Sequence, residues 1–147
     1  MMMESQNFVR LHGPVELATG EISCWKCRKG TPVHALLAAD VEEFEAGEEP
    51  MRIDASAFIY DLSADALPPT VQAKLGAIAA NYKPTFSRTV GQTSWSNVCV
   101  HCGLLQGAFF LHSEPDGPFF GGPEEFKGTR TVVAADGFDV DGASYSL

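Results

Sequence analysis

The spacing of hydrophobic and polar positions predicts a mixed structure in which short strands outnumber helices. Residues 8–18 hold two apolar groups separated by His12-Gly13-Pro14, which indicates one or two short strands. Residues 31–39 are almost entirely apolar but short for a helix, which favours a buried strand. Residues 52–60 alternate and predict a half-buried strand. The inner face of that strand would consist of Ile53, Ala55, Ala57 and Ile59.

Two segments have helix signals. Asp40 is a capping residue followed three positions later by Glu43, which predicts a short helix that Gly47 would end. The clearer helix is predicted over residues 69–81, because Pro69 suits a first turn and Pro84 prevents continuation. Its apolar stripe would consist of Val71, Leu75, Ile78 and Tyr82.

The second half of the chain adds further strands. Residues 84–98 are rich in β-branched, aromatic and hydroxyl side chains, which favours a strand. Residues 104–112 fit either periodicity, with a helix slightly favoured, and residues 129–134 predict a last strand. The fold class that follows is α+β.

The four cysteines form two Cys-x-x-Cys pairs, and these are the strongest chemical signal in the chain. They are Cys24, Cys27, Cys99 and Cys102. Two residues between sulfurs let one tight turn direct both thiolates at one point, and two such turns complete a tetrahedron around Zn²⁺. The 71 residues between the pairs exceed the roughly 15–20 of a compact zinc ribbon. We therefore expect one Zn²⁺ per chain, with a glycine, Gly30, relieving backbone strain after the first pair.

The two cysteine pairs predict a single zinc-binding domain over residues 1–147. Two knuckles, zinc-ribbon-like and each on a β-hairpin, would form the halves of a metal clasp, with an inserted strand and one amphipathic helix between them. The expected parts are clasp halves at about 22–39 and 84–112, an insert at about 40–83 and an acidic tail at about 113–147.

Other roles for the cysteines are less well supported. A thioredoxin-like dithiol opens a helix, whereas Cys27 is followed by Arg-Lys-Gly-Thr-Pro. Catalytic zinc needs an open coordination position, which four thiolates would fill, so no catalytic residues are predicted. His101 lies inside the second pair and could replace a cysteine, but with four thiolates it is expected to point outward or to hydrogen-bond a neighbour instead. His34 and His112 lie in apolar segments and are expected to be satisfied core histidines.

The net charge of −9 is unevenly distributed. Residues 40–65 contain nine acidic groups and one basic group, whereas residues 66–112 contain three basic groups and no acid. The overall acidity disfavours nucleic acid and anionic membranes. There is neither a long apolar run nor a signal-like N-terminus, so the sequence predicts a cytoplasmic protein without a membrane partner.

A partner surface is predicted on the basic side formed by the two knuckles. Its candidate contacts are Trp25, Lys26, Arg28, Lys29, Lys83, Arg88 and Trp95. A protein partner ranks above nucleic acid, which would need a dominant basic face. The leading functional prediction is a small zinc-binding interaction module, with a nucleic-acid-binding zinc ribbon and a thiol or redox protein as alternatives.

Both cysteine segments also resemble a family of uncharacterised bacterial proteins. In that family Cys-Trp-x-Cys and Val-x-Ala-Leu precede a Cys-x-His-Cys-Gly…Gln-Gly-x-x-Phe-Leu-His segment. The matching positions here include Val33, Ala35 and Leu36 after the first pair, and Gln106, Gly107 and Phe110-Leu111-His112 after the second. The match covers about 22–39 and 86–119. The resemblance implies a zinc site and no particular activity.

Overall fold

The computed structural model describes residues 7–147 and is organised around one long β-hairpin. Its strands, β1 (Phe8–Ser23) and β2 (Gly30–Phe44), pair antiparallel from Phe8↔Phe44 to Ser23↔Gly30. They form the centre of a seven-stranded sheet of order β10-β4-β2-β1-β8, in which β3 also pairs with β2 and β9 with β1. The other strands are β3 (Met51–Ile53), β4 (Ala57–Tyr60), β8 (Thr129–Ala134), β9 (Phe138–Val140) and β10 (Ser144–Ser146).

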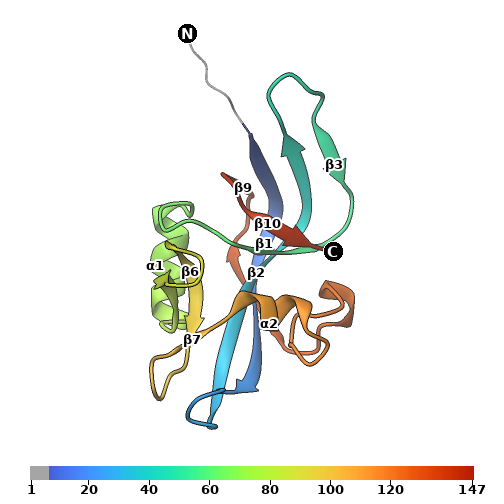
Figure 1. Cartoon of the computed structure of the whole chain (residues 1–147). Coiled ribbons are helices and arrows are strands. Elements are labelled where there is room, and N and C mark those ends of the chain that lie inside the picture. Colours follow the sequence, from blue (N-terminus) through green and yellow to red (C-terminus); the bar gives the residue numbers. More distant parts are fainter. Residues whose placement is uncertain (1–6) are drawn as a thin grey trace.

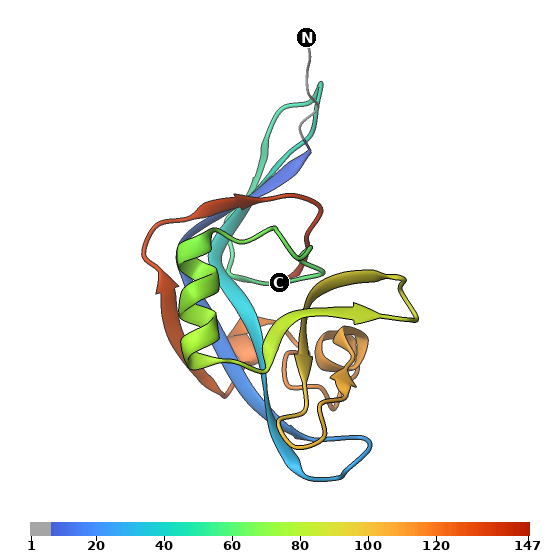
Figure 2. The same ribbon diagram turned by 90° about the vertical axis from the view of Figure 1, so that its left-hand side faces the viewer.

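A second, smaller sheet of order β5-β6-β7 lies beside the first. Its strands are β5 (Tyr82–Ser87), β6 (Gln92–Val98) and β7 (Leu105–Gln106). The helices are α1 (Pro69–Ile78), α2 (Ala108–Ser113) and the short 3-10 helix η1 (Pro123–Glu125). Figures 1 and 2 show α1 and α2 on different sides of the long hairpin. This mixture of mainly β structure with two α-helices agrees with the α+β prediction.

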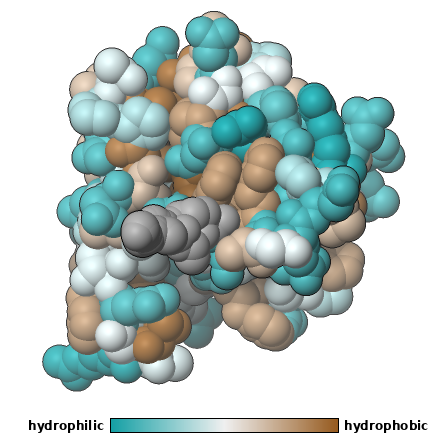
Figure 3. Space-filling model, turned by 90° about the horizontal axis from the view of Figure 1, so that it is seen from above, coloured by the Kyte–Doolittle hydropathy of each residue, from teal (hydrophilic) through white to brown (hydrophobic). Residues whose placement is uncertain are grey.

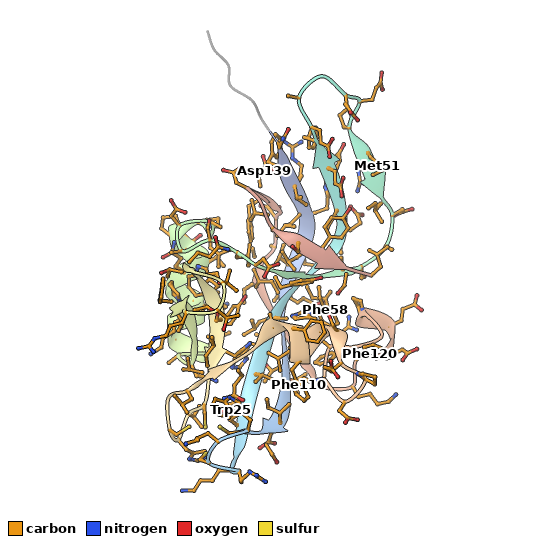
Figure 4. All side chains as sticks on the ribbon, viewed as in Figure 1. Trp25, Met51, Phe58, Phe110, Phe120 and Asp139 are labelled. Atoms are coloured by element: carbon orange, nitrogen blue, oxygen red, sulfur yellow. The ribbon has the colours of Figure 1, made fainter. Side chains whose placement is uncertain are left out.

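Both faces of β2 are buried, which explains its nearly continuous apolar sequence. Leu36 belongs to the core cluster that includes Leu75 of α1. Leu37, the next residue, belongs to a second cluster with Phe58 of β4 and Leu111 of α2. Successive side chains of a strand point to opposite faces, so a sheet covered on both sides needs apolar residues at consecutive positions. The predicted buried strand at 31–39 is confirmed, and Figure 4 shows Phe58 between β4 and the α2 region.

Two predictions for the first third of the chain were wrong. The break expected at His12-Gly13-Pro14 is only a register shift within β1, because the irregularity absorbs the proline without ending the pairing with β2. The helix expected at Asp40 is instead the end of β2, whose backbone pairs with β1 on one side and β3 on the other. The Asp40 carboxylate accepts hydrogen bonds from Arg52 at 3.2 and 3.0 Å rather than capping a helix.

The single strand predicted at 52–60 is two strands. β3 pairs with Val41–Glu43 and β4 with Leu36–Ala38, so the chain bends between them. Ala55 is exposed in this bend, and Phe58 is buried on the face that alternation assigned to solvent. The alternation fails because β4 is covered on both faces.

The predicted helix at 69–81 is present but ends at Ile78. Val71 and Leu75 are buried as expected, whereas Ile78 is 46% exposed and Ala79 is buried in its place. The chain leaves the helical path there, and Tyr82 reaches the core from β5 instead of from the helix.

The segments after α1 differ from prediction mainly in their turns. Residues 84–98 belong to a hairpin, with a turn at 88–91 between β5 and β6, because Gly91 takes a positive φ of 80°. Residues 104–112 contain both β7 and α2, so each periodicity applies to part of the segment. The strand predicted at 129–134 is confirmed as β8. The segment expected to be an acidic tail contributes β8, β9 and β10 to the main sheet.

Candidate metal centre

Two loops at one end of the molecule bring the four cysteines together. The first knuckle (residues 24–29) joins β1 to β2, and the second (residues 99–104) joins β6 to β7; Figure 2 shows both loops at the same end. The Sγ atoms are 3.7 Å apart between Cys24 and Cys102 and 3.6 Å apart between Cys27 and Cys99, and all four lie within 4.8 Å of one another. Four thiolates held tetrahedrally at the Zn–S bond length would be about 3.8 Å apart. This cluster can therefore hold a metal ion.

The two knuckles share one hydrogen-bond pattern. In each knuckle, the N–H of the first cysteine donates a hydrogen bond to the carbonyl five residues later. The carbonyl of the same cysteine accepts a hydrogen bond from the N–H four residues later. The N–H two residues after that cysteine donates to its Sγ. The donor–acceptor pairs are Cys24–Lys29 (2.9 Å), Arg28–Cys24 (3.0 Å) and Lys26–Cys24 (3.4 Å), then Cys99–Leu104 (2.9 Å), Gly103–Cys99 (2.9 Å) and His101–Cys99 (3.4 Å). Two copies of one turn thus present their thiols in the same way.

This turn requires a left-handed residue at its fifth position. Arg28 takes a φ of 66° there and Gly103 a φ of 79°. Glycine adopts this conformation without the steric penalty that a Cβ brings, so the first knuckle is strained where the second is not. The expectation that Gly30 relieves the strain was wrong, because the reversal is completed two residues earlier and Gly30 already pairs with Ser23.

Backbone N–H groups lower the pKa of the two buried cysteines. The N–H of Cys27, with that of Lys26, outweighs burial and lowers the pKa of Cys24 to about 6. At Cys99 burial acts in the opposite direction, but the N–H groups of Cys102 and His101 overcome it and lower the pKa. At Cys102 the Leu104 N–H also acts to lower the pKa, but burial and the neighbouring sulfurs outweigh it and raise the pKa to about 11. Thiolates are the form in which cysteine binds metals, so the two buried cysteines are prepared as ligands.

Four hydrogen bonds tie the knuckles to their surroundings. They run from His101 Nε2 to the Gly30 carbonyl (3.0 Å), from the Val100 N–H to Thr31 Oγ1 (3.1 Å), from Trp25 Nε1 to the Leu105 carbonyl (3.0 Å) and from Gln106 Nε2 to Cys24 Sγ (3.5 Å). His101 therefore bonds a neighbour, as the sequence predicts. Gln106 was not predicted as a site residue. The available signal was its place in the Gln-Gly-x-x-Phe-Leu-His motif of the family that the chain resembles.

Behind the knuckles, buried polar side chains join the two sheets. Asn97 accepts the His34 N–H at 2.7 Å and donates to the His34 carbonyl at 2.9 Å, as a neighbouring strand would. The His34 ring bonds Thr19 through Nδ1 (2.9 Å) and Asn81 through Nε2 (3.0 Å), and burial lowers its pKa. His34 is thus a satisfied core histidine, as predicted, whereas the network around it was missed because its partners lie 15 to 63 residues away.

The predicted partner residues do not form one surface. Trp25 is 62% exposed, and the cations of the first knuckle are exposed beside it. Figure 4 shows Trp25 at the knuckle end of the molecule. Lys83 is exposed on β5. Arg88 lies in the β5–β6 turn, separated from the second knuckle by the whole of β6, or about 20 Å. Trp95 is only 8% exposed, contacts the Tyr82 ring and donates to the Ala64 carbonyl, so it is a core residue.

The opposite end of the molecule shows a largely hydrophilic surface with smaller hydrophobic patches (Figure 3). Among residues 7–147, no helix is long and apolar enough to cross a membrane. The chain matches no protein-family model, no curated protein and no solved structure. The family resemblance thus remains a prediction. The feature of the described residues that indicates a function is the cluster of four cysteines.

Proposed function

We propose that this protein is a small zinc-binding module whose four cysteines hold one structural Zn²⁺ per chain. The spacing of the four Sγ atoms is the observation that carries the proposal, since every pair lies within 4.8 Å. The ligands would be Cys24, Cys27, Cys99 and Cys102. Four thiolates complete the coordination shell, which leaves no position for a substrate and favours a structural role over a catalytic one.

The ion would fasten the three-stranded sheet to the long hairpin. The first knuckle belongs to β1–β2 and the second to β6–β7, so a shared ion links parts of the chain 72 residues apart. Structural Zn²⁺ contributes on the order of 10 kcal/mol in small peptides, comparable with the roughly 5–15 kcal/mol stability of a whole domain. Four reduced thiols are required, a state that the predicted cytoplasmic location would maintain.

Metal analysis of the purified chain tests this proposal. We expect one Zn²⁺ per protein by elemental analysis, and one Co²⁺ on substitution, with the visible absorption of tetrahedral thiolate coordination. Cys27→Ser should lower the metal content or affinity, whereas Ser23→Ala, which neighbours Cys24 but leaves the four thiols intact, should not. A metal content near zero, with four thiols titrating in the folded chain, would contradict the proposal.

The module would act through a protein partner at the first knuckle. Support comes from an exposed aromatic ring, Trp25, beside the exposed cations Lys26, Arg28 and Lys29 on an otherwise acidic protein. Aromatic and cationic side chains together suit a partner with an acidic patch. The separation of Arg88 and the burial of Trp95 remove these two residues from the predicted surface, which leaves the first knuckle and the exposed Lys83.

Nucleic acid is the second candidate, because the same three cations could contact phosphate. Titration with single- and double-stranded oligonucleotides at about 50 and 200 mM salt separates the two. We expect no micromolar binding. Binding that weakens steeply with salt and is lost in Arg28→Glu/Lys29→Glu would favour nucleic acid. A thiol or redox role, which the lowered pKa of Cys24 could support, predicts instead that metal is lost readily and that Cys24 reacts first with an alkylating reagent.

A further inference from the structure

A cavity separate from the cysteines lies between the β5–β6 hairpin, the end of β4 and α2. Its volume is about 460 Å³, within the range of small-molecule sites, and none of the four cysteines lines it. The wall combines aromatic and aliphatic side chains with hydroxyl groups of β6. Representative lining residues are Ile59, Tyr60, Ser94, Trp95, Phe109 and His112.

His112 supplies an unpaired polar group to this cavity. The residue is only 9% exposed, and its ring stacks on Tyr60 at 4.3 Å and packs against Phe119 at 5.0 Å. Neither ring nitrogen hydrogen-bonds any residue of the described chain, 7–147, and Nδ1 is completely enclosed. Since His112 lines the cavity and its Nδ1 is enclosed, Nε2 is the ring nitrogen that can face a ligand there. The prediction that His112 is a satisfied core histidine was therefore wrong.

The enclosed nitrogen determines which atom carries the proton. Burial lowers the pKa of His112 to about 4, so the ring is neutral near pH 7. A neutral ring places its proton on one nitrogen, and a buried N–H without an acceptor is less tolerated than a buried lone pair. The proton therefore belongs on Nε2, which makes His112 a hydrogen-bond donor toward the cavity.

The charges around the cavity restrict what can accept that hydrogen bond. The lining contains the carboxylate of Asp61 and neither lysine nor arginine. A ligand carboxylate or phosphate would enter an apolar site without a compensating cation, which is unfavourable. A neutral acceptor on a flat apolar body fits both the unpaired donor and the aromatic walls.

We propose that this cavity binds a small uncharged molecule with a ring-sized apolar body and a neutral hydrogen-bond acceptor, such as an amide carbonyl or a heteroaromatic nitrogen, bound by His112 Nε2–H. This site is distinct from the proposed zinc centre. The cavity and the zinc centre lie next to each other in space, because Gln106 lines the cavity and also donates a hydrogen bond to Cys24 Sγ. Metal content is therefore measured on every sample, so that loss of the zinc centre is recognised separately from failure of the cavity to bind.

Three probes of nearly the same shape test the proposal: benzamide, benzoate and benzylamine. Binding is followed by NMR shifts of the His112 and Tyr60 ring protons in the full chain. We expect benzamide to bind with millimolar affinity, appropriate for its few atoms, and benzoate at least about tenfold more weakly. Benzylamine, which offers no neutral acceptor, should also bind more weakly than benzamide. Equal or tighter binding of benzoate or benzylamine, or no shift with benzamide at about 10 mM, would overturn the proposal.

Two variants locate the binding. His112→Phe retains an aromatic ring against Tyr60 but removes the donor, and benzamide affinity should fall at least about tenfold. His12→Phe changes a histidine outside the cavity and should leave the affinity unchanged. If His112→Phe does not fold, Ala108→Trp, at an exposed lining position, should block the cavity instead. Unchanged benzamide binding in whichever of these variants folds would refute the assignment.

Discussion

Replacing Asn97 by alanine should destabilise the protein strongly, although Asn97 is neither a metal ligand nor a large core residue. The side chain is 4% exposed and forms two hydrogen bonds with the backbone of His34, one to its N–H and one to its carbonyl. These bonds hold β6 against β2, where the two sheets meet without a backbone ladder between them. Alanine would leave both backbone groups of His34 unpaired.

The expected size follows from those two groups. Each buried polar group left without a partner costs about 1–3 kcal/mol, so the pair should cost about 4 kcal/mol. For a chain of 147 residues, typical unfolding entropies convert this loss to a fall in Tm of about 13 °C. Ser96 is the matched control, since its hydroxyl bonds only within β6, to Ser94. Ser96→Ala should cost less than about 1 kcal/mol.

Thermal and urea unfolding followed by circular dichroism, with saturating Zn²⁺ in every sample, would measure this difference. Equal metal content in parent, Asn97→Ala and Ser96→Ala would exclude metal loss as the cause. A loss below about 1 kcal/mol for Asn97→Ala would refute the reasoning, because it would mean that water or a rearranged backbone satisfies His34.

Further expectations concern the metal centre and pH. Cys99→Ser should lose a large share of the ~10 kcal/mol of zinc stabilisation and unfold at least residues 84–112, and a chelator should bring the parent close to the variant in melting experiments. A variant that melts within a few degrees of the parent would mean that the ion is dispensable for folding. Arg28→Gly should stabilise the protein by about 0.5–1 kcal/mol and Gly103→Ala destabilise it by about 1 kcal/mol, since both positions are left-handed; urea midpoints giving the opposite signs would contradict this. Folding lowers the pKa of His112 from 6.5 to about 4, so below pH 6.5 the unfolded chain takes up a proton that the folded chain does not. The resulting contribution of His112 to the free energy of unfolding, about 3 kcal/mol, is complete above pH 6.5 and is lost as the pH falls toward 4. His112→Phe should therefore flatten the dependence of stability on pH between 6.5 and 4, and an unchanged slope would exclude this contribution.

Short-range patterns predicted the cysteine cluster and many elements of the fold. The Cys-x-x-Cys spacing identified the four residues that the structure brings together, because each pair depends on one local turn. The apolar run at 31–39 and the β-branched run at 129–134 were strands as predicted. The apolar spacing correctly predicted that Val71 and Leu75 lie on the buried side of α1.

Errors arose where tertiary contacts overrode local signals. Asp40 has the spacing of a helix cap, but strand pairing on both sides of β2 outweighs it. Phe58 was assigned to the solvent face because alternation cannot show that a second layer, containing Leu111, covers that face. Trp95 was a candidate partner contact, yet it packs against Tyr82 and donates a hydrogen bond to the Ala64 carbonyl, 13 and 31 positions earlier in the chain.

The pairing of β1 with the distant strands β8 and β9 has a consequence for biosynthesis. β1 is made before the other strands of residues 7–147, and β2 covers only one of its long edges. The other edge pairs with Thr129–Ala134 and Phe138–Val140, which are synthesised more than a hundred residues after β1. At about 5–20 residues per second, more than a hundred residues of synthesis leave this edge open for about 5–20 seconds. An open strand edge is a template for association with other chains, so fragments that end before residue 129 should aggregate even when both cysteine pairs are present.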